Sequence, residues 1–258
     1  MSPHSRSAIV TRLRAAGCVF AEDEARLLVS AARSPAELDA LVHRRAAGQP
    51  LEHVLGWVEF YGLRLALDER VFVPRHRTEF LVHQAIALAP PGAVVVDLCC
   101  GSGALGAALV ANLDGVELHA ADVDPAAVRC ARRNLAAGRV YQGDLFKPLP
   151  PALRGRVDLL VANVPYVPTG EIGLLPPEAR EHEARVALDG GADGLDVLRR
   201  VAADAPRWLA PGGHLLVETS ERQAPRAVAI VGRAWLVPRV ATAEELAATV
   251  VIGTRPTG

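Results

Sequence analysis

The stretch Val-Val-Val-Asp-Leu-Cys-Cys-Gly-Ser-Gly, residues 94–103, decides the fold of this chain. Its valines predict a buried strand, and its glycine-rich end predicts a tight turn. The apolar run at 104–112 that follows predicts a helix. From here onward predicted strands and helices alternate, which is the pattern of a mostly parallel sheet with right-handed crossovers. We therefore predict an α/β fold.

The alternation continues to the end of the chain. Strands are predicted at 94–96, 116–121, around 140–141, at 157–162 and at 214–218, and two terminal strands near 235–237 and 249–252. Helices are predicted at 104–112, 125–137, 193–209 and 222–231. Asp124 is the expected N-cap of the second of these helices.

The region before this alternation predicts two smaller units. Apolar residues recur at helical spacing between residues 5 and 47, and Ser34-Pro35 is a typical helix start. The period then changes: Phe60 to Leu67 alternates, and Val71 to Val73 follows an acidic turn, which together predict a β-hairpin. A helix is expected at 78–88. We predict a helical domain at 1–50, a hairpin linker at 51–74 and a main domain at 75–258.

Composition limits the class of protein. The chain has 258 residues, half of them hydrophobic, and a formal net charge of -1. That charge creates no overall field for nucleic acid. The four cysteines, Cys18, Cys99, Cys100 and Cys130, show no metal-ligand spacing, and we predict no metal site. No signal peptide or bilayer-spanning run is found, so we expect a reduced, cytoplasmic protein, with a monomer favoured.

The motif Asn163-Val164-Pro165-Tyr166 is the candidate catalytic site. It follows the predicted strand at 157–162 and should lie at the carboxyl edge of the sheet, where α/β proteins bind ligands. The Asn163 amide oxygen and the Val164 carbonyl are two neighbouring acceptors, and Tyr166 adds an aromatic face. This set suits a planar nitrogen with two hydrogens, such as an amide or an exocyclic amine. The alternative is an ordinary strand-ending turn.

The loop after the first strand predicts a cofactor site. Glycines at 101 and 103 allow a ligand to approach the backbone, and an acid at the end of the second strand, Asp122, suits a ribose diol. Gly106 completes a pattern typical of nicotinamide sites, but no hydride-transfer partner follows. Asp97 favours instead a cation such as S-adenosyl-L-methionine. The expected cofactor-binding residues are Asp97, Cys99, Cys100, Gly101, Ser102, Gly103, Asp122, Asp144, Leu145 and Asn163.

The combination of motifs resembles the protein-(glutamine-N5) methyltransferases that modify peptide-chain release factors. The segments that carry the resemblance are 48–56, 60–62, 73–79, 97–103, Asp122, 144–146, 163–166 and 187–195. Val164 stands where the family motif, Asn-Pro-Pro-Tyr, has its first proline. Ala184 stands where the family usually has proline, and cysteines occupy cofactor-loop positions that usually hold glycine and a small residue. The chain is thus similar to that family or to a divergent relative of it.

The resemblance implies a class I S-adenosyl-L-methionine-dependent methyltransferase fold, Rossmann-like, with an antiparallel C-terminal strand. It implies methyl transfer to the side-chain amide of a glutamine in a protein, the Gly-Gly-Gln loop of a release factor being the candidate substrate. Asn163, Val164, Pro165 and Tyr166 would bind the amide. Arg75, Thr78 and Glu79 would close over the cofactor, steady the hairpin or simply begin a helix.

Three alternatives remain at this stage. The same acceptor pair would serve an adenine-N6 nucleic-acid methyltransferase, although charge and length argue against a basic groove. It would also serve a small-molecule N-methyltransferase. A non-catalytic cofactor-binding scaffold is the third alternative, and the presence of Asn163, Pro165 and Tyr166 argues against it.

Overall fold

The computed structural model describes residues 5–136 and 138–257. Its centre is a seven-stranded sheet in the order β5-β4-β3-β6-β7-β9-β8. The strands are β3 (Val94–Leu98), β4 (Glu117–Asp122), β5 (Arg139–Gln142), β6 (Val157–Ala162), β7 (Leu209–Thr219), β8 (Val237–Ala243) and β9 (Ala248–Thr254). Pairings from β5 to β7 are parallel, and β9 runs antiparallel to both β7 and β8. The predicted α/β fold with an antiparallel C-terminal strand is confirmed.

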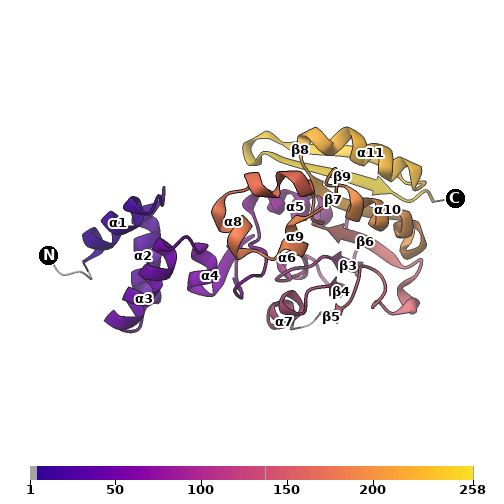
Figure 1. The fold of residues 1–258 in the computed structure, drawn as a ribbon. Coiled ribbons are helices and arrows are strands. Elements are labelled where there is room, and N and C mark those ends of the chain that lie inside the picture. Colours follow the sequence, from indigo (N-terminus) through magenta and orange to yellow (C-terminus); the bar gives the residue numbers. More distant parts are fainter. Residues whose placement is uncertain (1–4, 137, 258) are drawn as a thin grey trace.

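Helices cover both faces of the sheet, as Figure 1 shows. They are α5 (Glu79–Leu88), α6 (Ala104–Asn112), α7 (Pro125–Asn134), α10 (Asp196–Trp208) and α11 (Ala224–Arg233). Alternate residues of each strand face opposite sides: Val95 packs with α5 and α6, whereas Val94 and Val96 pack with α10 and α11. This explains the uninterrupted apolar strands, because a parallel sheet is buried on both faces.

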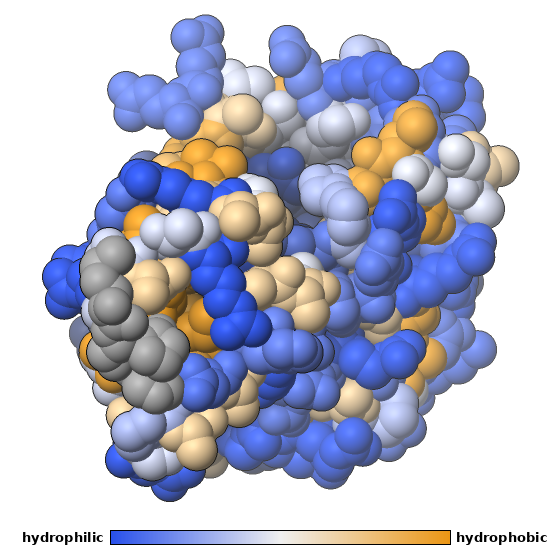
Figure 2. Space-filling view, turned by 60° about the vertical axis from the view of Figure 1, so that its left-hand side comes forward, coloured by the Kyte–Doolittle hydropathy of each residue, from blue (hydrophilic) through white to orange (hydrophobic). Residues whose placement is uncertain are grey.

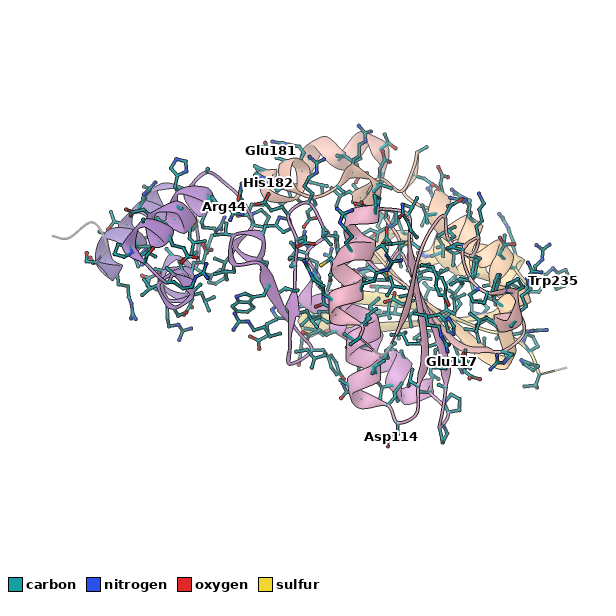
Figure 3. The ribbon with its side chains drawn as sticks, turned by 90° about the horizontal axis from the view of Figure 1, so that it is seen from below. Arg44, Asp114, Glu117, Glu181, His182 and Trp235 are labelled. Carbon is teal, nitrogen blue, oxygen red and sulfur yellow. The ribbon has the colours of Figure 1, made fainter. Side chains whose placement is uncertain are left out.

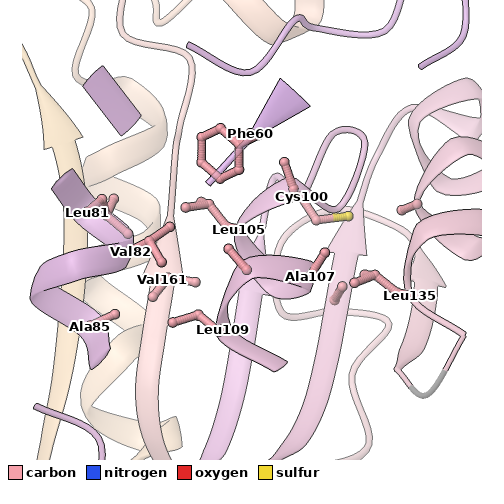
Figure 4. Packing of buried hydrophobic residues seen from close by; sticks show 14 of the residues in the cluster. Phe60, Leu81, Val82, Ala85, Cys100, Leu105, Ala107, Leu109, Leu135 and Val161 are labelled. Atoms are coloured by element: carbon pink, nitrogen blue, oxygen red, sulfur yellow. The ribbon is translucent and has the colours of Figure 1, made fainter. Parts of the chain in front are cut away.

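The packing of one face is seen in Figure 4, where Leu81 and Val82 of α5 and Leu105 and Leu109 of α6 gather around Val161 of β6. All five side chains are at most 5% exposed. Each such burial contributes roughly 1.5–3 kcal/mol to folding. This packing fixes α6, and with it the loop that precedes α6, relative to the carboxyl ends of β3 and β6.

The N-terminal helices form a separate packed group, α1 (Arg6–Ala15), α2 (Ala21–Ala31), α3 (Pro35–Ala46) and the short α4 (Leu51–Leu55). In Figure 1 they stand at the end of the molecule opposite the C-terminus. The buried Arg45 joins them to the main part through ion pairs with Glu24 of α2 and Glu178. Arg44 pairs with Glu69, and Figure 3 places Arg44 at this junction.

The hairpin prediction was wrong in its register. The strands are β1 (Trp57–Phe60) and β2 (Leu63–Ala66), so the turn falls at Tyr61-Gly62 inside the stretch predicted as one strand. Tyr61 and Gly62 both have positive φ, 51° and 73°, as a two-residue hairpin turn requires. The stretch 71–73 is irregular rather than a strand, although Val71 and Val73 are buried.

Several element boundaries differ from the predictions. Helix α7 ends at Asn134, and its predicted end at residue 137 lies outside the described residues. Asp124 caps it as predicted, accepting from the Ala126 N–H. The exposed Trp235 precedes β8 instead of beginning it. Several short helices were missed, among them α4 (Leu51–Leu55), η3 (Thr169–Leu174), α8 (Pro177–His182) and α9 (Arg185–Leu188). They are too short to show a helical period in the sequence.

The strand order places the site. The chain runs from β3 outward to β4 and β5, then crosses back to β6 on the other side of β3. Leu98 of β3 is the register partner of Ala162 of β6, so residues 99 and 163 leave the sheet side by side. Such a reversal of strand order opens a crevice at the carboxyl edge. In the described part of the chain, no helix is long and apolar enough to cross a membrane.

Candidate active site

A cavity of about 880 Å³ opens at this edge, between the loop after β3 and the end of β6. The predicted site residues that line it are Cys99, Cys100, Gly101, Ser102, Asp122, Asp144, Leu145, Asn163, Val164, Pro165 and Tyr166. Asp97 and Gly103 are not among the lining residues. The structure therefore brings the two predicted constellations, cofactor loop and Asn163 motif, into one cavity.

The glycine loop is tied to the end of β4. The Gly101 N–H donates to Asp122 Oδ2 at 2.9 Å, and the other oxygen of Asp122 accepts from the Asp124 N–H at 2.8 Å. Burial raises the pKa of Asp122. Gly101 has a positive φ of 55°, and a Cβ there would meet only open space. The loop thus presents bare backbone, with one carboxylate beside it, to the cavity.

Asp97 lies behind this loop. It is fully buried, and its Oδ2 accepts from the Gly106 N–H at 3.1 Å. Its Oδ1 has no hydrogen-bond partner among residues 5–136 and 138–257. Burial chiefly, with a smaller contribution from the nearby Asp122 and against the lowering effect of the Gly106 hydrogen bond, raises the pKa of Asp97 to about 7. Gly103 serves packing: a Cβ there would lie 2.8 Å from Leu135 Cδ1.

Asp144 is already paired. Both of its oxygens accept from Arg200 Nη2, at 2.6 and 2.7 Å, and Lys147 lies 2.8 Å away. The Arg200 hydrogen bonds, followed by the one from Lys147, lower the pKa of Asp144. Leu145 has a positive φ of 51° and lines the cavity. Arg200 also lines it, and sequence reasoning missed this residue because it is one of several arginines on a helix.

The two adjacent cysteines are chemically quiet. Cys99 and Cys100 are both free thiols, and burial raises the pKa of each well above its usual range. A protonated, buried thiol behaves as a small apolar group. Cys99 adopts a positive φ of 54°, and the Cys100 N–H donates to the Ala121 carbonyl at 3.2 Å. Both residues line the cavity and shape its wall.

Asn163 is oriented by Thr78. Its Nδ2 donates to Thr78 Oγ1 at 3.4 Å, and Thr78 is 2% exposed. With the NH2 end held there, the Oδ1 end remains available. Among the described residues, neither Asn163 Oδ1 nor the Val164 carbonyl accepts a hydrogen bond from another group. Asn163 and Val164 both line the cavity, and their use as a pair of acceptors stays a prediction.

Tyr166 is held at both ends. Its hydroxyl donates to Glu218 Oε1 at 3.1 Å and accepts from Arg77 Nη2 at 2.6 Å. Its backbone carbonyl accepts from Gln223 Nε2 at 2.9 Å. Sequence reasoning missed Arg77, Glu218 and Gln223. One signal was available for Glu218, which is an acid at the carboxyl end of an apolar strand.

The segment 188–194 supports the Asn163 motif from behind. The Val167 N–H donates to the Leu188 carbonyl, and the Gly190 N–H donates back to the Val167 carbonyl. A Cβ on Gly190 would lie 2.6 Å from the Pro165 carbonyl oxygen, and one on Gly194 only 2.2 Å from that of Tyr166. The glycines of this segment are thus required for close backbone packing against the motif.

The segment 75–79 is fixed by acids on both sides. Arg75 pairs with the buried Glu183, and Glu79 Oε1 accepts from the Tyr61 N–H at 2.9 Å, which steadies the hairpin turn. Arg75 and Thr78 line the cavity. Thr78 makes no side-chain capping bond to α5. Of the roles considered for this segment, steadying the hairpin is observed for Glu79.

The residues around the loop fit S-adenosyl-L-methionine. The open space at Gly101 admits a ligand against the backbone, and Ser102 Oγ is buried at the cavity without a hydrogen-bond partner in the described chain. Asp122 offers a carboxylate for a diol, and Leu145 an apolar surface for a base. We expect these groups to hold the donor. No cluster with metal-binding geometry occurs among the described residues.

Comparison with known proteins agrees with this reading. A family model described as a methyltransferase small domain matches residues 77–174. The release factor glutamine methyltransferase of Geobacter sulfurreducens is 41% identical over 207 residues, 78% of this chain and 72% of that protein. The one of Cereibacter sphaeroides is 36% identical over 263 residues, 93% of this chain and 92% of that protein.

A solved methyltransferase from Pyrococcus furiosus shares the fold, with a TM-score of 0.57 at 14% identity over 84% of this chain and 98% of that one. The fold is that of the class I S-adenosyl-L-methionine-dependent methyltransferases, and S-adenosyl-L-methionine is the cofactor. With more than a third of its residues identical over most of both chains, this chain belongs to the release factor glutamine methyltransferase family.

Proposed function

We propose that this enzyme methylates the N5 amide nitrogen of a glutamine in the Gly-Gly-Gln loop of a peptide-chain release factor. The observation that carries the proposal is the pair of unused acceptors, Asn163 Oδ1 and the Val164 carbonyl, at the wall of the cavity. A primary amide has two N–H donors in one plane. Two neighbouring acceptors match it in number.

The valine in the motif does not remove this match. Val164 contributes its carbonyl, which any residue supplies, and its side chain is 2% exposed and packs in the core with Leu195. A proline at this position would offer the same acceptor. The departure from the family motif therefore changes the packing behind the wall and leaves the acceptor pair in place.

The acceptor pair has a defined task in the reaction. An amide nitrogen is a poor nucleophile because its lone pair is delocalised into the carbonyl group. Bound beside it, the donor would supply the methyl group: the N–CH3 bond would form as the S–CH3 bond breaks, S-adenosyl-L-homocysteine would leave, and one amide proton would pass to solvent. Asn163 Oδ1 and the Val164 carbonyl hold the two N–H groups and stabilise the positive charge that builds on nitrogen. Holding the nitrogen in one orientation supplies much of the remaining rate enhancement.

The cavity has room for a protein loop. We call the part lined by the glycine loop, Asp122, Asp144 and Leu145 the donor half. Outside this part, the lining of the cavity includes Phe72, Pro74, Leu175, Pro176 and Glu178, of which Glu178 pairs with Arg45 of the N-terminal helices. We propose that the glutamine enters from this side. In the view of Figure 2, with the N-terminal unit toward the viewer, the surface is largely hydrophilic, with apolar groups in small separate patches.

The test is methyl transfer from tritium-labelled S-adenosyl-L-methionine to recombinant release factor. Label should appear on the glutamine of the Gly-Gly-Gln loop, located by peptide mapping, and should be absent from a release factor carrying glutamate at that position. Donor binding, measured in parallel by calorimetry, shows that the enzyme is folded. Donor binding without label on the release factor would contradict the proposed substrate.

A further inference from the structure

We propose that Glu218 and Arg77 are positioning residues that fix the ring of Tyr166 in the acceptor half of the cavity. By the acceptor half we mean the part lined by Thr78 and the motif 163–166. This inference rests on the proposed function, because the ring is expected to lie against the planar amide. Neither residue belongs to the motif itself. Arg77 lies next to Thr78 in the segment 75–79, and Glu218 lies near the end of β7.

The three side chains form a closed triangle of hydrogen bonds. The Tyr166 hydroxyl donates to Glu218 Oε1 at 3.1 Å, and Arg77 Nη2 donates to that hydroxyl at 2.6 Å. Arg77 Nε donates to the same carboxylate oxygen, Glu218 Oε1, at 3.1 Å. Each member therefore contacts the other two. A ring held by its hydroxyl in this way cannot turn out of the wall without breaking two bonds.

Sheet register places Glu218 next to the motif. Val217 of β7 is the register partner of Ala162 of β6, so Glu218 and Asn163 emerge side by side at the carboxyl edge. The other end of Tyr166 is fixed through its carbonyl by Gln223. The aromatic ring is thus the part of Tyr166 whose orientation depends on Glu218 and Arg77.

Stability alone does not explain a carboxylate at this place. Glu218 is 2% exposed, and its Oε2 has no hydrogen-bond partner in the described part of the chain. A buried ion pair with an unsatisfied oxygen stabilises a fold no better than apolar residues of similar volume do. Orienting Tyr166 gives Glu218 a reason to be buried here.

The hydrogen bonds of the Tyr166 hydroxyl suit it to orient the Tyr166 ring and not to take part in the reaction. Its proton is donated to Glu218, and one lone pair accepts from Arg77. Burial raises the pKa of Tyr166 well above its usual range, and the neighbouring Glu218 raises it further. The hydroxyl therefore stays protonated at all working pH values. A role as general base would show as a changed pH profile in its absence, and a positioning role would not.

A double-mutant cycle tests the coupling. We expect Tyr166→Phe and Glu218→Gln each to lower kcat about tenfold, with the dissociation constant of the donor within about twofold of wild type. In the Tyr166→Phe background, Glu218→Gln should cost less than about twofold further, because its target is gone. The pH profile should keep its shape. As a control, Arg222→Gln breaks the exposed pair with Glu171 and should leave kcat unchanged.

Equal costs of Glu218→Gln in both backgrounds would overturn the inference, since they would show a role independent of the Tyr166 hydroxyl. A second measurement separates this from failure of the proposed function. The chain has three tyrosines, so ring-carbon-labelled tyrosine gives few NMR signals, and Tyr166→Phe identifies the one of interest. Glu218→Gln should shift that signal and leave the others. An unchanged signal overturns the inference whatever the substrate proves to be.

Discussion

The two halves of the cavity are assembled in different ways. In the donor half, Asp97 bonds Gly106 nine residues away, and Gly101 bonds Asp122 twenty-one residues away. In the acceptor half, Thr78 and Asn163 are 85 residues apart, and Tyr166 and Glu218 are 52 apart. The glycine-loop part of the donor half is thus one strand, one loop and the next strand, with Asp144, paired with Arg200 56 residues away, as the exception. The acceptor half is collected from distant parts of the chain.

This difference predicts which property, donor binding or turnover, a substitution in each half should change. A change in the donor half should weaken donor binding, because we expect the loop to bind the donor through its own backbone. A change in the acceptor half should lower turnover while donor binding persists, because its residues meet only where the strand ends converge. The predictions below test this separation.

The largest effect is expected for Asn163→Ala. It removes one of the two acceptors, and loss of one such preorganised group typically lowers kcat about 10²–10³-fold. The donor should still bind within about threefold of wild type by calorimetry, since the alanine leaves the glycine loop intact. Turnover is measured with labelled donor. If Asn163→Ala turned over at a rate near that of the wild type, Asn163 would have no part in the mechanism.

Asp122→Ala changes the donor half and should weaken donor binding. The carboxylate holds the Gly101 N–H and is the group we expect to bind a ribose diol. Losing hydrogen bonds to a charged group costs about 1.5–3 kcal/mol, so the dissociation constant of the donor should rise about 10- to 100-fold. At saturating donor, kcat should change by less than about threefold. A large loss of kcat with normal donor binding would show that Asp122 serves turnover and not donor binding.

Gly194→Ala should lower turnover about tenfold without touching any reacting group. Gly194 has a positive φ of 77°, and a Cβ would lie 2.2 Å from the Tyr166 carbonyl oxygen, so the motif must shift. Gly155→Ala is the matched control, because its φ of 72° imposes similar backbone strain, and its Cβ would meet open space. If both variants lose turnover equally, backbone strain alone is responsible.

The smallest effect concerns the pH dependence of stability. The pKa of Asp97 is raised to about 7, chiefly by burial. The unfolded chain releases this proton near pH 4, so stability falls as pH rises from about 4 to about 7 and then levels off. In Asp97→Asn this part of the fall should vanish, so Tm should drop less between pH 4 and pH 7 than it does in the wild type.

The measurement is thermal unfolding between pH 4 and pH 8 without donor. Asp122 and Glu183, whose pKa values burial also raises, remain in both proteins and provide the common background. Parallel Tm curves for wild type and Asp97→Asn would show that Asp97 titrates normally in the folded protein.

Sequence reasoning was accurate where structure is local. The α/β alternation, the N-cap Asp124 and the glycine loop depend on neighbouring residues, so their patterns could be read directly. The hairpin register was wrong because alternation continues across Tyr61-Gly62, and only their positive φ angles reveal the turn. Short helices such as α8 gave no periodic signal.

The alternation of strands and helices in the main domain, the glycine at position 101 and the candidate acceptors of Asn163 and Val164 could be read from the sequence, because each depends on adjacent residues. The contacts of Thr78 with Asn163 and of Arg77 and Glu218 with Tyr166 are visible in the folded structure alone. These contacts arise because the crossover after β5 sets β6 between β3 and β7. A sequence pattern does not specify which strand ends meet, and hydrogen bonds form only between groups that the packed sheet brings within reach.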